Sequence, residues 1–177
     1  MHSSVCIELN TMSNFVFFWS HRTMKPGCLS NWWRCKFVVN GTEYNCTEQY
    51  MMAQKAMLFG DTRHLQDILA TADPKRIKEL GRLVENFDTR VWDKHKAQIM
   101  FDGCYAKFAQ NPELRDYICS FGNDITFVEA SPYDRVWGIG LRATDPRAQH
   151  PELWLGKNLL GQTLTLVQQR LLQENGK

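Results

Sequence analysis

The stretch WWRCKFVVNGTEYNCTEQYMMAQKAMLFG, residues 32–60, contains the change from strand to helix that decides the fold class. In its first half, the pair Asn40-Gly41 separates two short runs with strand character. Asn-Gly readily takes the left-handed backbone dihedrals of a two-residue turn. We therefore predict a β-hairpin in this half of the stretch.

The second half of the stretch has a helical pattern. Asn45 or Thr47 can cap the first free amides of a helix, and Gly60 can end it. Within that helix Glu48 and Lys55 lie seven residues apart, which is two turns, so both project from one mostly apolar face. The sequence thus predicts a helix that carries two opposite charges on an apolar stripe.

Outside this stretch the pattern keeps strands and helices largely separate. Strand-type runs come before it, and helix starts marked by Asp or Asn follow it. We expect a strand at 15–19, helices beginning at Asp61, Asp73-Pro74, Asp88 or Asp93, and Asn111-Pro112, a strand at 124–130, and a last helix at 158–173. This order predicts a single α+β domain, with N-terminal strands and a hairpin followed by a mainly helical body.

Length and composition are those of one globular domain. With 177 residues, 44% of them hydrophobic and 23% charged, the chain can bury one core and lacks the composition of a disordered protein. We expect residues 1–12 to form a flexible lead-in and residues 13–174 to form the domain. The net charge of +2 falls well short of a dedicated non-specific nucleic-acid binder, so any contact with nucleic acid should be local.

The sequence shows neither a secretory signal nor a membrane span. The N-terminus lacks the basic start and apolar run of a signal peptide, and no run approaches the roughly 18 apolar residues of a spanning helix. The six cysteines form no CxxC pair and have no closely spaced His partners, so we expect reduced thiols and no metal. We accordingly expect a cytoplasmic protein without membrane contact.

Two interpretations of the charged pair on the first helix are open. In the first, Glu48 reaches back to Asn45 as part of a capping box, and Lys55 extends its ammonium along an apolar stem to water. In the second, both line a pocket, where burial would raise the pKa of the Glu and lower that of the Lys. Such groups could carry protons or act as an amine nucleophile near neutral pH.

The segment SPYDRVWGIGL, residues 131–141, follows a predicted strand and holds a second group of candidates. Gly138 permits backbone turns that other residues resist. Asp134 either accepts amides of its own turn or binds substrate hydroxyls or a water. Trp137 either fills the core or stacks on a flat ring, and the same two interpretations apply to Trp92 at the start of a later helix.

Several common enzyme motifs are absent. The sequence has no P-loop, no GxGxxG after a strand, no GxSxG and no HExxH. It therefore gives no support to nucleotide hydrolysis by a P-loop, hydride transfer on a Rossmann fold, serine hydrolase chemistry or zinc proteolysis.

Taken together, the segments resemble the NADAR superfamily, also called YbiA-like. The segments that carry the resemblance keep the family's order and spacing from about residue 15 to residue 172; they are FFWSHR, LSNWW, FxVxGxxY, TEQYMMAQKA, LGRLVENFDTRVWD, SPYDRVWGIGL and GKNLLGQTL. The resemblance implies a YbiA-like fold. It also implies hydrolysis of an N-glycosidic bond between ribose and an arylamine nitrogen, without a cofactor or a metal.

The resemblance extends to the individual site residues. It implies acid and base catalysis by Glu48, a Schiff base or charge stabilisation by Lys55, and orientation of ribose hydroxyls or water by Asp134. Trp92 and Trp137 would stack on the base or ribose. Further substrate-binding candidates are Ser20, Arg22 and Asn31, whose donors suit phosphate oxygens, and Gly138.

The substrate remains open at this point. We favour ADP-ribose attached to the amino group of guanine in DNA or RNA, because basic clusters at Lys75-Arg76-Lys78 and Lys94-Lys96 could meet phosphates. The alternatives are a ribosylamino-pyrimidinone phosphate of riboflavin biosynthesis, or a non-catalytic ADP-ribose reader. We expect the protein to act as a monomer.

Overall fold

A computed structural model of the chain describes residues 14–175 and confirms an α+β fold of helices and short strands. The expected lead-in at residues 1–12 lies outside the described residues. The strands of the described part are β1 Phe15–Phe18, β2 Phe37–Val39, β3 Thr42–Tyr44 and β4 Thr126–Glu129. Its α-helices are α1 Thr47–Leu58, α2 Thr62–Ala70, α3 Pro74–Arg82, α4 Thr89–Gln110, α5 Pro112–Cys119 and α6 Leu159–Asn175.

Most of the predicted helix starts are correct. The side chains of Asp61, Asp73 and Asp88 each accept backbone amides in the first turn of α2, α3 and α4, which identifies Asp88 rather than Asp93 as the start of the long helix. Each cap satisfies amides that the helix itself leaves without a partner. Pro74 and Pro112 occupy first-turn positions, as predicted.

The start of α1 differs from the prediction. Its N-cap is Cys46, which makes no side-chain cap hydrogen bond. Asn45 lies one residue before the cap: its Nδ2 donates to the carbonyl of Thr71, at 3.3 Å, and its Oδ1 has no hydrogen-bond partner in the described chain. The capping-box role belongs to Gln49, whose Oε1 accepts the backbone amide of Asn45 at 2.9 Å, so the Glu48 carboxyl is not used for capping.

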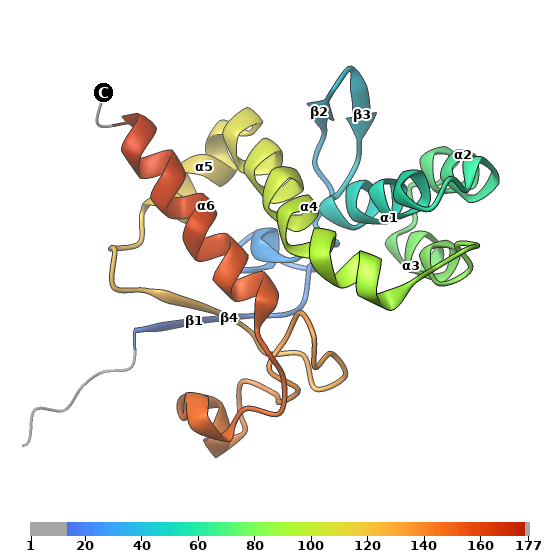
Figure 1. Cartoon of the computed structure of the whole chain (residues 1–177). Coiled ribbons are helices and arrows are strands. Elements are labelled where there is room, and N and C mark those ends of the chain that lie inside the picture. The colour runs from blue at the N-terminus through green and yellow to red at the C-terminus, as the bar shows by residue number, and fades with distance from the viewer. Residues whose placement is uncertain (1–13, 176–177) are drawn as a thin grey trace, which may run out of the picture.

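The predicted hairpin is present. Strands β2 and β3 pair antiparallel, and the turn residues Asn40 and Gly41 have φ values of 49° and 79°. The hairpin projects away from the body in Figure 1 and is tied to α4 by Gln110, which makes two hydrogen bonds to the backbone of Val38.

The second sheet joins distant parts of the chain. Strand β1 pairs parallel with β4. Most strands come before the helices along the sequence, but this sheet joins the first strand to the last one, which follows α5. The Asn158 side chain fixes β4, because its Oδ1 accepts the amide of Glu129 at 3.0 Å and its Nδ2 donates to the carbonyl of Phe127 at 2.8 Å. This arrangement holds the C-terminal end of β4 beside the start of α6.

Helix α1 lies at the centre of the domain, where α2, α3 and α4 pack around it (Figure 1). Residues on nearly all its sides are buried, as expected of a helix enclosed by others rather than lying on the surface. A polar side chain on α1 therefore faces either packed neighbours or an internal cavity.

Two further sequence expectations concern thiols and membranes. Cys28, Cys35, Cys46, Cys104 and Cys119 are unpaired, while Cys6 lies outside the described residues. Among residues 14–175, no helix combines the length and the apolar character needed to cross a membrane.

Candidate functional site

A cavity of about 1030 Å³ opens between α1, α3, the start of α4 and the loop after β4. Its lining comes from residues 19–22, 30–32, 48–55, 78–96 and 129–137, which are far apart in the sequence. Eight of the nine predicted site residues line it: Glu48, Lys55, Asp134, Trp92, Trp137, Ser20, Arg22 and Asn31. The structure thus brings these candidates together, as expected of a binding site.

Glu48 is the buried carboxyl of the cavity. It is only 4% exposed, its backbone amide donates to the carbonyl of Asn31 at 3.0 Å, and the Trp32 side chain hydrogen-bonds to its carboxyl. Burial is the main reason that its pKa rises from 4.5 to about 7, with opposition from the charge of Lys78 and support from that of Asp134. Glu48 can therefore exchange a proton near neutral pH.

Lys55 lies two turns further along α1 and is half-buried. Its Nζ donates to the carbonyl of Gly81 at 2.7 Å and lies 4.1 Å from the ring centroid of Phe87 and 5.9 Å from that of Trp92. Within the described chain no carboxylate forms an ion pair with it. Desolvation lowers the pKa of this amine, which favours the neutral, nucleophilic form.

Asp134 stabilises its own turn and also faces the cavity, so both roles considered for it are compatible with the structure. Its Oδ1 accepts the backbone amides of Val136 and Trp137, at 2.9 and 2.8 Å, so it stabilises its own turn. It also lines the cavity and raises the pKa of Glu48 through its charge.

Each of the two tryptophan candidates contacts both the hydrophobic core and the cavity. Trp92 and Trp137 are half-buried, pack against the hydrophobic core and line the cavity. Each therefore offers part of its ring surface to a ligand while the rest is held by the core.

Gly138 is the predicted site residue that the structure places outside the cavity lining. A Cβ at this position would lie 2.8 Å from the carbonyl oxygen of Glu129 and 3.0 Å from that of Asp134. The absence of a side chain lets the turn fold tightly against β4, so Gly138 shapes the loop rather than the lining.

Glu129 is a site residue that the sequence pattern did not reveal. It is the last residue of β4, it lines the cavity, and its Oε2 is buried without a hydrogen-bond partner in the described chain. Burial, followed by the charges of Asp134 and Glu48, raises its pKa to about 8, while Lys78 acts in the opposite direction. The only sequence signal was a carboxylate at the end of the short strand TFVE.

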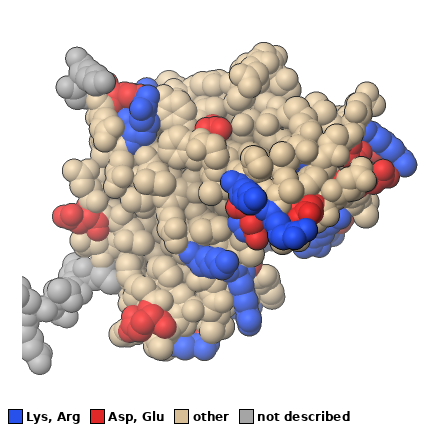
Figure 2. All heavy atoms as spheres, viewed as in Figure 1, with Lys and Arg blue, Asp and Glu red and all other residues tan. Residues whose placement is uncertain are grey.

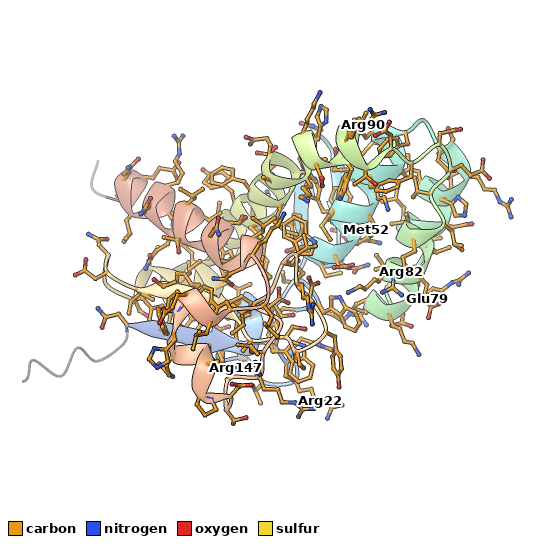
Figure 3. The ribbon with its side chains drawn as sticks, turned by 60° about the horizontal axis from the view of Figure 1, so that its bottom comes forward. Arg22, Met52, Glu79, Arg82, Arg90 and Arg147 are labelled. Atoms are coloured by element: carbon orange, nitrogen blue, oxygen red, sulfur yellow. The ribbon has the colours of Figure 1, made fainter. Side chains whose placement is uncertain are left out.

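Five cations line the cavity in addition to Lys55: Arg22, Lys78, Arg82, Lys96 and Arg135. They come from the loop after β1, from α3, from α4 and from the loop after β4. Figure 3 shows Arg82 on α3 near Met52 of α1, with Arg22 apart from them among the loops, and Figure 2 shows Lys and Arg gathered over the first part of α4 and the loops below it. Cations from several directions suit a ligand with more than one phosphate.

The predicted basic clusters divide at the cavity. Lys78 and Lys96 line it, whereas Lys75, Arg76 and Lys94 do not. Within residues 14–175, no three His, Cys, Asp or Glu side chains come together in a way that could hold a metal ion.

The mixed fold and a cavity with two carboxyls of raised pKa and a desolvated amine define a candidate acid–base or covalent catalyst. The chain belongs to the NADAR domain family, whose model matches residues 17–172. The family resemblance seen in the sequence is therefore confirmed.

Relatives of known name and structure agree with this assignment. The chain is 43% identical to N-glycosidase R617 of Acanthamoeba polyphaga mimivirus, over 88% of this chain and 95% of that protein. It is 30% identical to N-glycosidase Npun_R5314 of Nostoc punctiforme, over 82% of this chain and 85% of that protein. It is 28% identical to the riboflavin biosynthesis protein VVA0006 of Vibrio vulnificus, over 95% of this chain but only 42% of that longer protein.

The fold itself has a solved counterpart. The NMR structure of the Escherichia coli protein YbiA superimposes with a TM-score of 0.76 at 26% identity, covering 94% of this chain and 90% of YbiA. The expected YbiA-like fold is confirmed.

Proposed function

We propose that this protein is an N-glycosidase that hydrolyses the C1'–N bond between a ribose and an arylamine nitrogen. The observation that carries the proposal is that one cavity holds the buried Glu48 carboxyl, with a pKa of about 7, and the desolvated Lys55 amine. Acid–base groups are most effective when their pKa lies near the working pH. The names of the mimivirus and Nostoc relatives support the same reaction class.

The proposed reaction uses the Lys55 amine and the Glu48 carboxyl in sequence. The neutral Lys55 amine attacks C1' as the C1'–N bond breaks, and the electron pair of that bond leaves with the arylamine nitrogen, which takes up the proton of the Glu48 carboxyl. The C1'–O4' bond of the ribose ring then opens, its electron pair goes to O4', and O4' takes a proton from the Lys55 nitrogen, which leaves the sugar held as a Schiff base on Lys55. Water, activated by the Glu48 carboxylate, hydrolyses the Schiff base, releasing the sugar and restoring the amine.

Substrate binding in this proposal uses the remaining lining. The Asp134 oxygen not used by its turn orients ribose hydroxyls or the water, and the ring surfaces of Trp92 and Trp137 receive the base or ribose. The donors of Ser20, Arg22 and Asn31 lie on the same lining for phosphate contacts.

We further propose that the substrate is ADP-ribose attached to the amino group of guanine in nucleic acid. The cavity volume is at the upper end of the roughly 300–1,000 Å³ typical of ligand sites, which favours a ligand the size of a dinucleotide. The five cations of the lining suit a diphosphate. Trp19 and Tyr133, 44% and 80% exposed, lie beside the cavity with ring centroids 6.1 Å apart, where a flanking base could stack.

A second candidate substrate is a ribosylamino-pyrimidinone phosphate of riboflavin biosynthesis. The observation that favours it is the similarity to a Vibrio vulnificus protein named for riboflavin biosynthesis. This substrate carries one phosphate, so it would use only part of the cationic lining.

The test is incubation of the purified protein with a guanine ADP-ribosylated oligonucleotide and, in parallel, with a ribosylamino-pyrimidinone phosphate. Released sugar is measured by mass spectrometry, with Glu48→Gln as the inactive control. Release from the oligonucleotide alone supports the proposal, and release from the pyrimidinone alone establishes the second candidate. Release from neither substrate, with ADP-ribose still bound, would make the protein a reader and refute the proposed catalysis.

A further inference from the structure

The backbone amide and carbonyl of Glu129 are both hydrogen-bonded, whereas one oxygen of its carboxyl has no partner in the described chain. The amide of Glu129 donates to Asn158 Oδ1 at 3.0 Å, and its carbonyl accepts the amide of Ile139 at 2.9 Å. The next amide along, that of Ala130, donates to Phe18 at 2.8 Å. Hydrogen bonds on both sides of β4 therefore fix the position from which the Glu129 side chain enters the cavity.

A structural role does not explain this carboxyl. A buried polar group retained for stability is normally hydrogen-bonded, because leaving it unpaired costs free energy. Glu129 Oε2 is buried without a partner in the described chain, although the residue lines a cavity large enough for a ligand. The arrangement fits a group whose partner is a bound substrate.

The charges that face Glu129 come from three separate elements. They are Glu48 on α1, Asp134 in the loop after β4, and Lys78 on α3. Burial and the two carboxylates raise the pKa of Glu129 to about 8, against the charge of Lys78, while the pKa of Glu48 is about 7. The negative charge of an ionised Glu48 opposes ionisation of Glu129. Glu48 accepts a hydrogen bond from the Trp32 side chain, which favours its carboxylate form, whereas Glu129 Oε2 has no partner in the described chain, so Glu129 is the carboxyl that keeps its proton.

We infer that Glu129 is a second catalytic carboxyl, which donates the proton to the departing arylamine nitrogen while Glu48 serves as the base. The inference rests on the proposed N-glycosidase function. The family resemblance assigned both acid and base catalysis to Glu48, and the inference divides these two roles between Glu129 and Glu48. Two carboxyls with separated pKa values are the usual way to divide these roles.

The proton balance of this division is complete. As C1'–N breaks, its electron pair goes to nitrogen, which receives the Glu129 proton and leaves as a neutral amine. The Lys55 amine meanwhile holds the sugar as the Schiff base of the proposed reaction. Water then adds hydroxide to C1' of that Schiff base and gives its proton to the Glu48 carboxylate, and collapse of the adduct releases the sugar and the Lys55 amine. Transfer of that proton to Glu129, directly or through solvent, restores both carboxyls, so the net reaction consumes one water.

The inference predicts a particular pH profile. Activity should rise as Glu48 ionises near pH 7 and fall as Glu129 loses its proton near pH 8, which gives a narrow bell. Glu129→Gln cannot ionise, so its residual activity should lack the alkaline fall while it keeps the acidic rise.

The experiment compares two ribosyl substrates that differ in the need for a proton. One is the arylamine substrate established for the wild type, and the other is a nitrophenyl riboside, whose nitrophenolate leaves without protonation. Glu129→Gln should lower kcat on the arylamine by ~10²- to 10⁴-fold with little change in KM. It should lower kcat on the nitrophenyl riboside by less than about tenfold, whereas Glu48→Gln should impair both substrates.

Glu43→Gln is the matched control, because Glu43 lies on the exposed hairpin and outside the cavity. Equal losses of Glu129→Gln on both substrates, or an alkaline fall that persists in this variant, would overturn the inference. Should Glu129→Gln fail to fold, Glu129→Ala, which also lacks a proton to donate, must show the same difference between substrates. Wild-type protein that cleaves neither substrate would refute the proposed function, whereas an active wild type and a fully active Glu129→Gln would refute only this inference.

Discussion

Replacing Glu48 with glutamine should stabilise the folded protein at alkaline pH while it removes turnover. The folded-state pKa of about 7 lies above the ordinary 4.5, so ionisation is penalised in the folded state and stability is lost as pH rises from 4.5 to 7. The pKa difference of about 2.5, at about 1.4 kcal/mol per pKa unit, gives roughly 3.5 kcal/mol in full, of which about 3 kcal/mol falls between pH 4.5 and pH 8. Glutamine cannot ionise and can still accept a hydrogen bond from Trp32, so the variant avoids this cost.

The assay is thermal and urea unfolding of the wild type and Glu48→Gln at pH 4.5 and pH 8. The advantage of the variant should grow by about 3 kcal/mol between the two pH values, or roughly 6–12 °C in Tm for a chain of this size. Glu43→Gln, which alters an exposed carboxylate, should show no such growth. If the stability difference between Glu48→Gln and the wild type is the same at both pH values, the reasoning from burial is wrong.

Three further predictions concern the amine, the cavity mouth and the packing of α6. Lys55→Ala should abolish trapping of the sugar on the protein by borohydride, and persistent trapping would show that another amine forms the Schiff base. Tyr133→Ala should lower kcat/KM on a modified oligonucleotide by ~5- to 150-fold, the value of one base stack, but leave cleavage of the free nucleoside unchanged; equal effects on both would contradict base stacking. Gly161→Ala should destabilise the protein by at least ~1–3 kcal/mol in urea unfolding, because its Cβ would lie 2.0 Å from the carbonyl oxygen of Phe127. Gly122→Ala is its control, since nothing lies within 4 Å of the added atom, and equal stability of the two variants would contradict the packing argument.

The parts of the fold that depend on local chemistry could be predicted from the sequence. The helix caps and the hairpin turn depend only on residues a few positions apart, so the sequence alone is enough to predict them. They are the caps at Asp61, Asp73 and Asp88 and the turn at Asn40-Gly41. The cap at Cys46 could not be predicted, because Cys46 makes no side-chain cap hydrogen bond and so leaves no local signal in the sequence. The pairing of β1 with β4 has no local signal at all.

The residues of the cavity were likewise only partly predictable from the sequence. The seven-residue spacing of Glu48 and Lys55 marked both as facing one side of a helix, and the structure places both on the lining. Glu129 was missed because the alternation of a short strand does not show which of its faces meets a cavity. Arg82 was missed because its position depends on how α3 packs beside α1.

The parallel pairing of β1 with β4 also determines when the site can exist during synthesis. Phe15 faces Thr126, so 111 residues separate partners in the sheet. At a synthesis rate of about 5–20 residues per second, the apolar strand FVFF stays unpaired for roughly 5–20 s until β4 has been synthesised. Because β4 also delivers Glu129 and leads into the Asp134 loop, the cavity and the sheet are completed together. In a nascent chain the first strand therefore stays unpaired until residues 126–129 have left the ribosome.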